Sequence, residues 1–172
     1  MKWFRSLWWL GAILGVFSVQ CGLLASATPI RLEPPEPGKC IQDVAGLITE
    51  SDGLAIRPLC ARLSEEQDVP LVVVTINSMV DTGWPWGGIE PFARTLFEQW
   101  GRDPDVEFAG SWRRGILLLV SEGDRKARIE LGADWAGQYD EQCQRIMDQL
   151  IVPEFEVGNY SDGIYRGVVG LE

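Results

Sequence analysis

The alternation of hydrophobic and polar positions between residues 113 and 132 predicts a β-hairpin made of two unlike strands. Residues 116–120 are apolar throughout, which is typical of a strand covered on both faces. From Lys126 to Leu131 charged and apolar side chains alternate, as in a strand with one face in water. A three-residue linker that holds Gly123 joins the two runs, so we expect a hairpin whose second strand borders the sheet.

The remaining pattern predicts one more buried strand and four helices. Residues 69–77 are apolar and rich in β-branched side chains, which favours a central strand. Elsewhere apolar positions recur at helical spacing, and Pro58 and Pro153 limit two of the helices because proline disrupts a helix interior. The expected helices cover about residues 57–66, 90–101, 139–150 and 162–171.

Together these elements predict an α/β fold, a three-layer α/β/α sandwich with a mixed central sheet that contains the hairpin. Ligands in such folds gather beyond the carboxyl ends of the strands. The segments that follow the two buried strands, residue 77 onward and residues 121–124, are therefore the expected neighbourhood of a site. Residues 40–172 are long enough to form this domain around a single hydrophobic core.

The first 27 residues have the composition of a secretory signal peptide. Lys2 and Arg5 precede an apolar stretch, and the small residues 25–27 provide a cleavage site. A retained membrane anchor is the alternative, because about 20 apolar residues span a bilayer. We expect an extracytoplasmic protein, periplasmic or secreted, that contacts a membrane only through residues 1–27 if they are not cleaved. Residues 28–39 hold four prolines and predict a stiff spacer.

The chain is strongly acidic, with 15 Lys and Arg against 25 Asp and Glu and a formal charge of −10. Cleavage after residue 27 would remove Lys2 and Arg5 and change the charge from −10 to −12. An acidic surface repels nucleic acid and anionic lipids and favours cations or basic partners. We therefore expect no nucleic-acid partner.

Cys40, Cys60 and Cys143 remain after cleavage of the signal peptide. An odd number leaves at least one thiol without a partner in the chain, and the sequence does not decide whether Cys60 pairs with Cys143. No C-x-x-C motif is present, which argues against a thiol oxidoreductase.

The chain contains no histidine, and this absence excludes several kinds of chemistry. Ser-His-Asp and Cys-His nucleophile systems, histidine zinc sites and a histidine general base all require that side chain. The sequence also has no phosphate-binding G-x-x-x-x-G-K-[ST] loop. Carboxylate chemistry remains.

Asp103, Asp105 and Glu107 alternate in a loop of the kind that binds hard cations such as Ca²⁺ through oxygen ligands. The spacing is similar to the start of a calcium loop. However, the sixth and twelfth places hold Phe108 and Arg114 instead of the required glycine and glutamate. A solvated acidic loop is the simpler interpretation.

Several segments in a fixed order resemble the TPM domain family, named for thylakoid lumen, photosystem-repair and nematode receptor-modulator proteins. No single motif is decisive, but the ordered combination is fairly specific and spans essentially all of residues 40–172. The segments are DVAGLI (43–48), LVVVTINS (71–78), PFARTLFEQWG (91–101), RGILLLVSEGDRKARIELG (114–132) and IVPEFEVGNYSDGIYRGVVGL (151–171).

The resemblance implies an extracytoplasmic α/β/α domain. Members of the family are linked to the upkeep of membrane protein complexes, to calcium binding and, in a few cases, to acid phosphatase activity. By position, the family's acids match Asp43, Asp124 and Asp162, and its Trp-Gly pair matches Trp100 and Gly101. The residues before the buried strand and after the edge strand, 113–115 and 132–136, depart from the family pattern, which argues against an inherited metal site.

Two functional hypotheses follow. The first is a non-catalytic accessory domain that binds a protein partner, such as a membrane protein complex, through the tryptophan loop of Trp84 and Trp86, because tryptophan dominates interface hot spots.

The second hypothesis is a phosphomonoester hydrolase that depends on Ca²⁺ or another divalent cation. Its cation would be held by Asp43, Asp103, Asp105 and Asp124. Each acid also has a structural alternative, because aspartate caps backbone N–H groups at turns and helix starts. For Asp43 this is the turn over residues 44–46, for Asp124 the hairpin turn, and for Asp162 the last helix.

Overall fold

The computed structural model describes residues 29–85, 87–135 and 137–172. The expected signal peptide and Trp86 lie outside the described residues. Four strands form one sheet in the order β1 (Ile41–Asp43), β2 (Leu71–Ile76), β3 (Ile116–Ser121) and β4 (Lys126–Leu131). β1 and β3 run parallel to β2, and β4 runs antiparallel to β3. The sheet is therefore mixed, as predicted.

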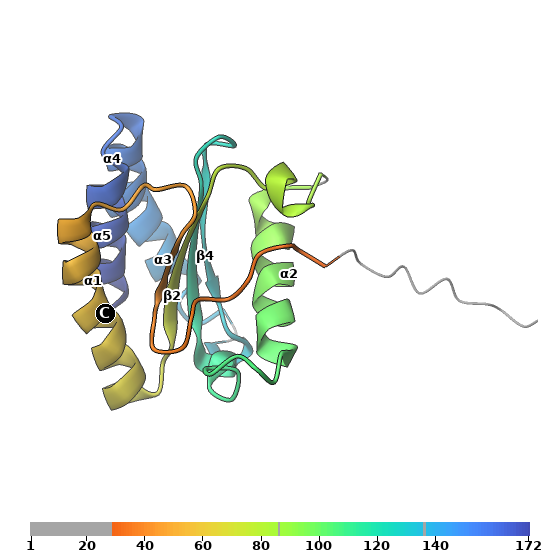
Figure 1. Cartoon of the computed structure of the whole chain (residues 1–172). Coiled ribbons are helices and arrows are strands. Elements are labelled where there is room, and N and C mark those ends of the chain that lie inside the picture. The colour runs from red at the N-terminus through yellow and green to blue at the C-terminus, as the bar shows by residue number, and fades with distance from the viewer. Residues whose placement is uncertain (1–28, 86, 136) are drawn as a thin grey trace, which may run out of the picture.

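Helices cover both faces of this sheet and make the three expected layers (Figure 1). One face packs against α1 (Glu50–Gln67), α3 (Asp140–Ile146) and α5 (Tyr160–Leu171), and the other packs against α2 (Ile89–Arg102). The shorter helical elements are η1 (Val80–Thr82), η2 (Trp112–Arg114), η3 (Ala133–Trp135), the π-helical turn η4 (Met147–Ile151) and α4 (Val152–Glu156). None of the helices in the described part of the chain is long and apolar enough to cross a membrane.

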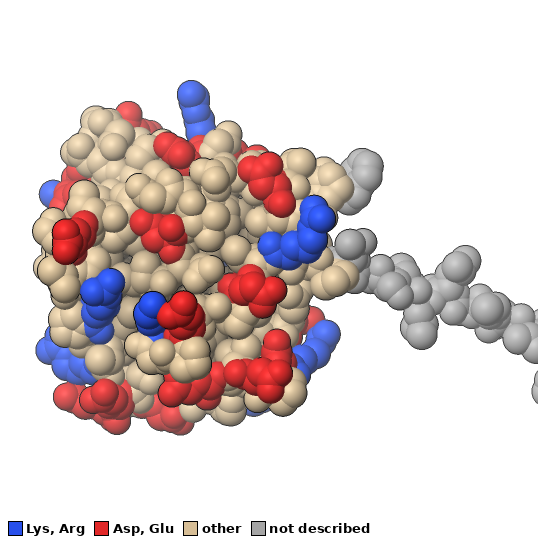
Figure 2. Space-filling model, viewed as in Figure 1, with Lys and Arg blue, Asp and Glu red and all other residues tan. Residues whose placement is uncertain are grey.

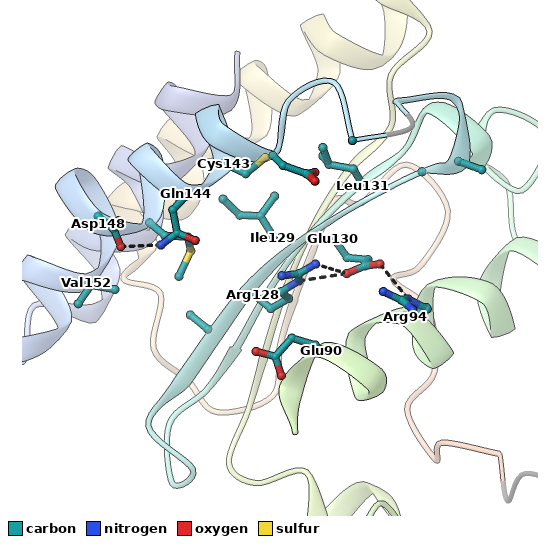
Figure 3. A pocket seen from close by; sticks show the side chains of 16 residues that line it. Glu90, Arg94, Arg128, Ile129, Glu130, Leu131, Cys143, Gln144, Asp148 and Val152 are labelled. Atoms are coloured by element: carbon teal, nitrogen blue, oxygen red, sulfur yellow. Dashed lines mark hydrogen bonds and ion pairs between the residues drawn. The ribbon is translucent and has the colours of Figure 1, made fainter. Parts of the chain in front are cut away.

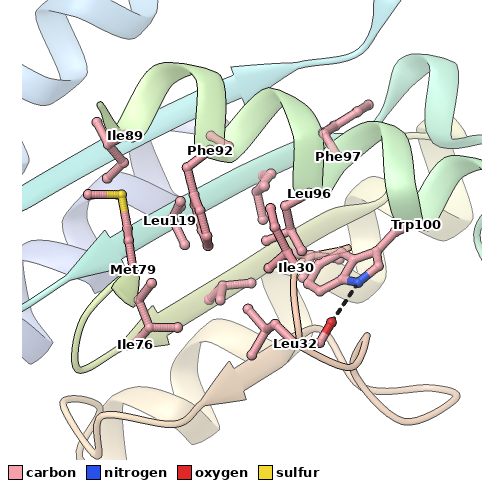
Figure 4. Packing of buried hydrophobic residues seen from close by; sticks show 14 of the residues in the cluster. Ile30, Leu32, Ile76, Met79, Ile89, Phe92, Leu96, Phe97, Trp100 and Leu119 are labelled. Atoms are coloured by element: carbon pink, nitrogen blue, oxygen red, sulfur yellow. Dashed lines mark hydrogen bonds between the residues drawn. The ribbon is translucent and has the colours of Figure 1, made fainter. Parts of the chain in front are cut away.

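The two buried strands divide their side chains between two hydrophobic clusters. Val72 and Leu117 face α2, whereas Val73 and Leu118 face the opposite layer, and all four are at most 2% exposed. This burial on both faces explains why β2 and β3 carry no polar alternation. The α2 cluster also receives Ile30 and Leu32 from the N-terminal segment, and the Trp100 indole donates a 3.2 Å hydrogen bond to the Leu32 carbonyl (Figure 4).

Two helices differ from the sequence expectation at their prolines. α1 begins at Glu50, where the Thr49 hydroxyl accepts a hydrogen bond from the Asp52 N–H, so Pro58 lies in the helix interior. Pro58 is on the exposed side of α1, where water can reach the carbonyl that has lost its donor. Pro153 does not end the helical region that begins with α3, because it lies in the first turn of α4, which follows the π-helical turn η4 directly.

The hairpin turn is one residue longer than expected. Residues 122–125 lie between β3 and β4, and Arg125 takes a left-handed conformation with φ of 52°. Gly123 donates a 2.8 Å hydrogen bond to the Asn77 carbonyl, and a Cβ at this position would lie 2.7 Å from that oxygen. The glycine therefore serves a close backbone approach between the hairpin and the loop after β2.

Candidate functional site

Asp43 lies at the carboxyl end of β1 and fixes the turn that follows it. Its carboxylate accepts hydrogen bonds from the N–H groups of Leu47 (2.9 Å) and Ile48 (3.1 Å) and from the Thr75 hydroxyl on β2. The Thr75 hydroxyl in turn accepts a 3.2 Å hydrogen bond from the Ala45 N–H. Asp43 therefore joins β1, β2 and the turn before α1 at the carboxyl ends of these two strands.

Asp124 has an equivalent role at the hairpin. It accepts hydrogen bonds from the Ser121 hydroxyl (2.6 Å), the Met79 N–H (2.8 Å) and the Ser78 hydroxyl (3.3 Å). The Ser121 hydroxyl and then the Met79 N–H hold the pKa of the Asp124 carboxyl below its ordinary value, because both stabilise the ionised form. Asp124 thus ties the hairpin to the loop that follows β2.

Asp103 and Asp105 lie in the loop between α2 and η2, which leads into the amino end of β3. Asp103 accepts a 3.0 Å hydrogen bond from the Asp105 N–H, a turn stabilised within the loop itself. The structure therefore places Asp43 and Asp124 at the carboxyl ends of the parallel strands, and Asp103 and Asp105 near the amino end of β3. Among residues 29–85, 87–135 and 137–172, no group of three or more His, Cys, Asp or Glu is arranged to hold a metal ion.

The four acids do not converge on one cation site in the described structure. Asp43 and Asp124 are each directed at protein N–H and hydroxyl donors, and these contacts occupy both oxygens of Asp43. A cation site needs several oxygen ligands that face a common centre. Asp162 lies in the first turn of α5, where it forms a 2.7 Å ion pair with Arg166 and makes no capping contact.

Trp84 belongs partly to the hydrophobic core. Its ring packs edge-on against Phe92 of α2, with centroids 5.8 Å apart and an interplanar angle of 77°. The indole Nε1 is buried and has no hydrogen-bond partner within the described residues. A buried donor without an acceptor is costly. Because the ring is partly buried against the α2 cluster, only part of the Trp84 side chain is accessible to a partner.

A groove runs along the outer edge of β4, and the sequence indicated only that this strand would border the sheet. Its cavity volume is about 560 Å³. Glu90 and Arg94 of α2 form one wall, and Cys143 and Gln144 of α3 lie in the other (Figure 3). Met147 of η4 also lines the groove. Residues 127–132 form the floor. The alternating pattern of β4 was the available signal, but neither wall could be inferred from it.

The polar face of β4 is more buried than the alternating sequence pattern predicts, as Glu130 shows. The residue is 9% exposed, because α2 covers that face of the strand. Its carboxylate forms ion pairs with Arg128 at 3.0 Å and with Arg94 of α2 at 3.7 Å (Figure 3). A buried charge needs such partners. On the face drawn in Figure 2, by contrast, basic side chains are scattered among acidic ones and do not gather into a patch.

The cysteine side chains lie in two places. Cys40 and Cys60 contact each other, and contact with Cys40 together with burial raises the pKa of the Cys60 thiol. Cys143 lines the β4 groove, where burial and the nearby Asp140 raise the pKa of its thiol. All three are free thiols in the structure. The neighbour of Cys60 is therefore Cys40.

Comparisons with known proteins identify a family through its model and a shared fold through two solved structures. The family model described as TPM domain matches residues 41–172. The solution structure of the N-terminal domain of a protein from P. gingivalis is similar, with 25% identity and a TM-score of 0.63 over 78% of this chain and 80% of that chain. The N-terminal domain of the cg2496 protein from Corynebacterium glutamicum shares 15% identity and a TM-score of 0.56 over 84% and 85%. No curated protein matches the chain.

Proposed function

The chain belongs to the TPM domain family, and from this premise we propose that it is a non-catalytic, extracytoplasmic accessory domain that binds a protein partner and helps to maintain a membrane protein complex. The β4 groove carries this proposal. Natural proteins usually cover or distort the edges of their sheets, because an open edge invites another chain. Here a regular six-residue edge strand lies open between two helices. Such a surface is suited to completion by a partner.

The placement of the acids supports binding over hydrolysis. A metal-dependent phosphatase would need Asp43, Asp103, Asp105 and Asp124 around one cation. Asp43 and Asp124 hold backbone turns at the carboxyl ends of the parallel strands, whereas Asp103 and Asp105 lie near the amino end of β3. Asp43 and Asp124 thus have a structural role that is independent of a metal.

Site-specific photo-crosslinking in the native cells tests the partner-binding proposal. A photoreactive side chain at Gln144, which is exposed and lines the groove, is expected to trap one discrete protein from the membrane fraction. The same side chain at Leu54 of α1, which is 58% exposed and outside the groove lining, is the matched control. Equal trapping at both positions, or none at Gln144, would contradict the proposal.

Thermal unfolding in chelator and in Ca²⁺, Mg²⁺ or Mn²⁺ tests the alternative. A ligand at about 100 times its dissociation constant adds roughly 2.7 kcal/mol of stability. We expect the midpoint of unfolding to stay the same for all three ions, together with no hydrolysis of phosphate esters. A rise specific to one ion that disappears in Asp43→Asn and in Asp124→Asn would favour the phosphatase instead.

A further inference from the structure

Resting on the proposed function, we propose that the β4 groove binds an extended segment of the partner protein as a fifth strand of the sheet. The segment would have alternating apolar and polar residues and at least one basic side chain. Three independent features of the groove define this ligand: the backbone groups of β4, the two unlike walls, and the charge of the lining.

The register of the hairpin shows which backbone groups of β4 are free. Gly132 donates a 2.9 Å hydrogen bond to the carbonyl of Gly115, the residue opposite it when the register of the hairpin is extended by one position, so this position belongs to the series of hydrogen-bonded antiparallel pairs. Such pairs alternate along the ladder, and the N–H and C=O groups of the residues between them point away from β3. In β4 these residues are Ala127, Ile129 and Leu131. Their backbone groups have no hydrogen-bond partner among the described residues.

A chain laid along this edge would therefore find three donors and three acceptors at a spacing of two residues. Main-chain hydrogen bonds of this kind supply affinity in strand addition, and the pockets for alternate side chains supply specificity. The spacing requires the ligand to be extended, because only a strand offers its own groups with the same period.

The walls of the groove assign the alternate side chains of the ligand. On the α2 side the strand presents Arg128 and Glu130 beneath Arg94, so a ligand residue that points there meets charged groups (Figure 3). On the other side Met147 packs in the same hydrophobic cluster as Ile129 of β4, and Val152 also lines the groove. Successive side chains of a strand point to opposite faces. The ligand is therefore expected to be polar toward α2 and apolar toward η4.

The charge of the lining favours a basic residue in the ligand. Four acids and two arginines line the groove, and both arginines are within 4 Å of Glu130. Glu90, Asp140 and Asp148 form no ion pair within the described residues. A lysine or arginine of the ligand would meet this excess of negative charge, which aids association and register.

A second copy of the chain is a poorer occupant. β4 is recessed between α2 on one side and α3 with η4 on the other, as Figure 3 shows. The same strand of another copy would be recessed in the same way, so the helices of the two copies would meet before the strands could pair. A single extended segment has no such obstruction.

Selection from a randomised library of ten-residue peptides tests the inference on the full chain. We expect enriched peptides to show a two-residue apolar period and a basic residue. In the tightest peptide, N-methylation of the alternate residues that face β4 should weaken binding at least tenfold, whereas N-methylation of the intervening residues should have little effect. No enrichment, enrichment without the two-residue period, or equal loss from both N-methylated sets would overturn the inference.

Amide hydrogen exchange locates the binding site in the same complexes. Binding of the tightest peptide should slow exchange of the Ala127, Ile129 and Leu131 amides at least tenfold and leave Arg128, already bonded to β3, nearly unchanged. Protection elsewhere would overturn the inference. If Gln144 traps a membrane protein but no peptide pairs with β4, the proposed function stands and this inference falls. If peptides pair with β4 but Gln144 traps no protein, the preference of the groove for an extended basic segment stands, whereas the proposed role in binding a membrane-associated partner falls.

Discussion

Replacement of Asp43 separates a structural carboxylate from a metal ligand. In Asp43→Ala the N–H groups of Leu47 and Ile48 and the Thr75 hydroxyl all lose their acceptor. An unsatisfied buried donor costs about 1–3 kcal/mol, and hydrogen bonds to a charged group are at the upper end of the usual range. The turn is only partly buried, so water can replace part of this loss. We expect a decrease of about 2–4 kcal/mol in the free energy of unfolding.

Urea unfolding of the wild type, Asp43→Ala and Asp43→Asn in chelator measures this loss. Linear extrapolation to zero urea gives the free energy of unfolding, and an unchanged slope shows that unfolding exposes the same amount of surface in each variant. Asparagine retains one carbonyl acceptor but places an NH₂ group among N–H donors. The decrease in the free energy of unfolding should therefore be at least about half as large in Asp43→Asn as in Asp43→Ala.

The cation dependence of the same measurement is the decisive control. A carboxylate that caps a turn acts equally in chelator and in millimolar Ca²⁺. A loss below about 0.5 kcal/mol in chelator would refute the capping role, because surface substitutions without a specific contact fall in that range. A loss that appears only when Ca²⁺ is present would show instead that Asp43 acts through a bound cation.

Three further predictions follow from local contacts. The hydrogen bonds to Asp124 hold the pKa of its carboxyl below the unfolded value of about 4. The contribution of Asp124 to stability is therefore present above that pH and is lost as the pH falls through the folded pKa. The stability difference between wild type and Asp124→Asn should shrink from pH 6 to pH 2.5, and a constant difference would contradict this. Gly132→Ala should destabilise by more than about 2 kcal/mol, since its Cβ would lie 2.2 Å from the Arg113 carbonyl oxygen, whereas Gly110→Ala, with nothing within 4 Å, should cost little; equal effects in urea unfolding would count against the contact. Mild oxidation by a small-molecule disulfide should join Cys40 to Cys60 and stabilise the fold by about 3 kcal/mol. Mass spectrometry would detect the bond as the loss of two hydrogen atoms, together with the loss of two free thiols. A mixed disulfide with the reagent as the only product would show that the two sulfur atoms cannot meet.

Local periodicity was sufficient for much of the fold. The local sequence pattern indicated that β2 and β3 are buried on both faces and that α2 is buried on one face. The structure confirms the predicted α/β/α sandwich. Period and hydrophobicity are properties of a short segment, so they can be read before its partners are known. The edge position of β4 was also predicted for this reason.

Functional placement could not be predicted in the same way. Asp43 and Asp124 were identified as acids near strand ends, but their hydrogen-bond partners lie in other segments, Thr75 for the first and Met79 for the second. The burial of Glu130 depends on α2, which the chain completes more than twenty residues earlier. A side chain's role follows from what it contacts, and contacts between distant segments are absent from local pattern.

The sequence by itself determined the type and order of three strands and four helices and the acidic, histidine-free chemistry, because composition and period do not depend on tertiary contacts. It did not identify β1 or α4, which are too short to show a period of their own. Only the tertiary structure decided which groups Asp43 and Asp124 contact, that Cys40 neighbours Cys60, and that two helices leave the outer edge of β4 open in a groove. These arrangements arise when segments far apart in the chain pack together. Their geometry is set by how helices cover a twisted sheet, which no single segment encodes.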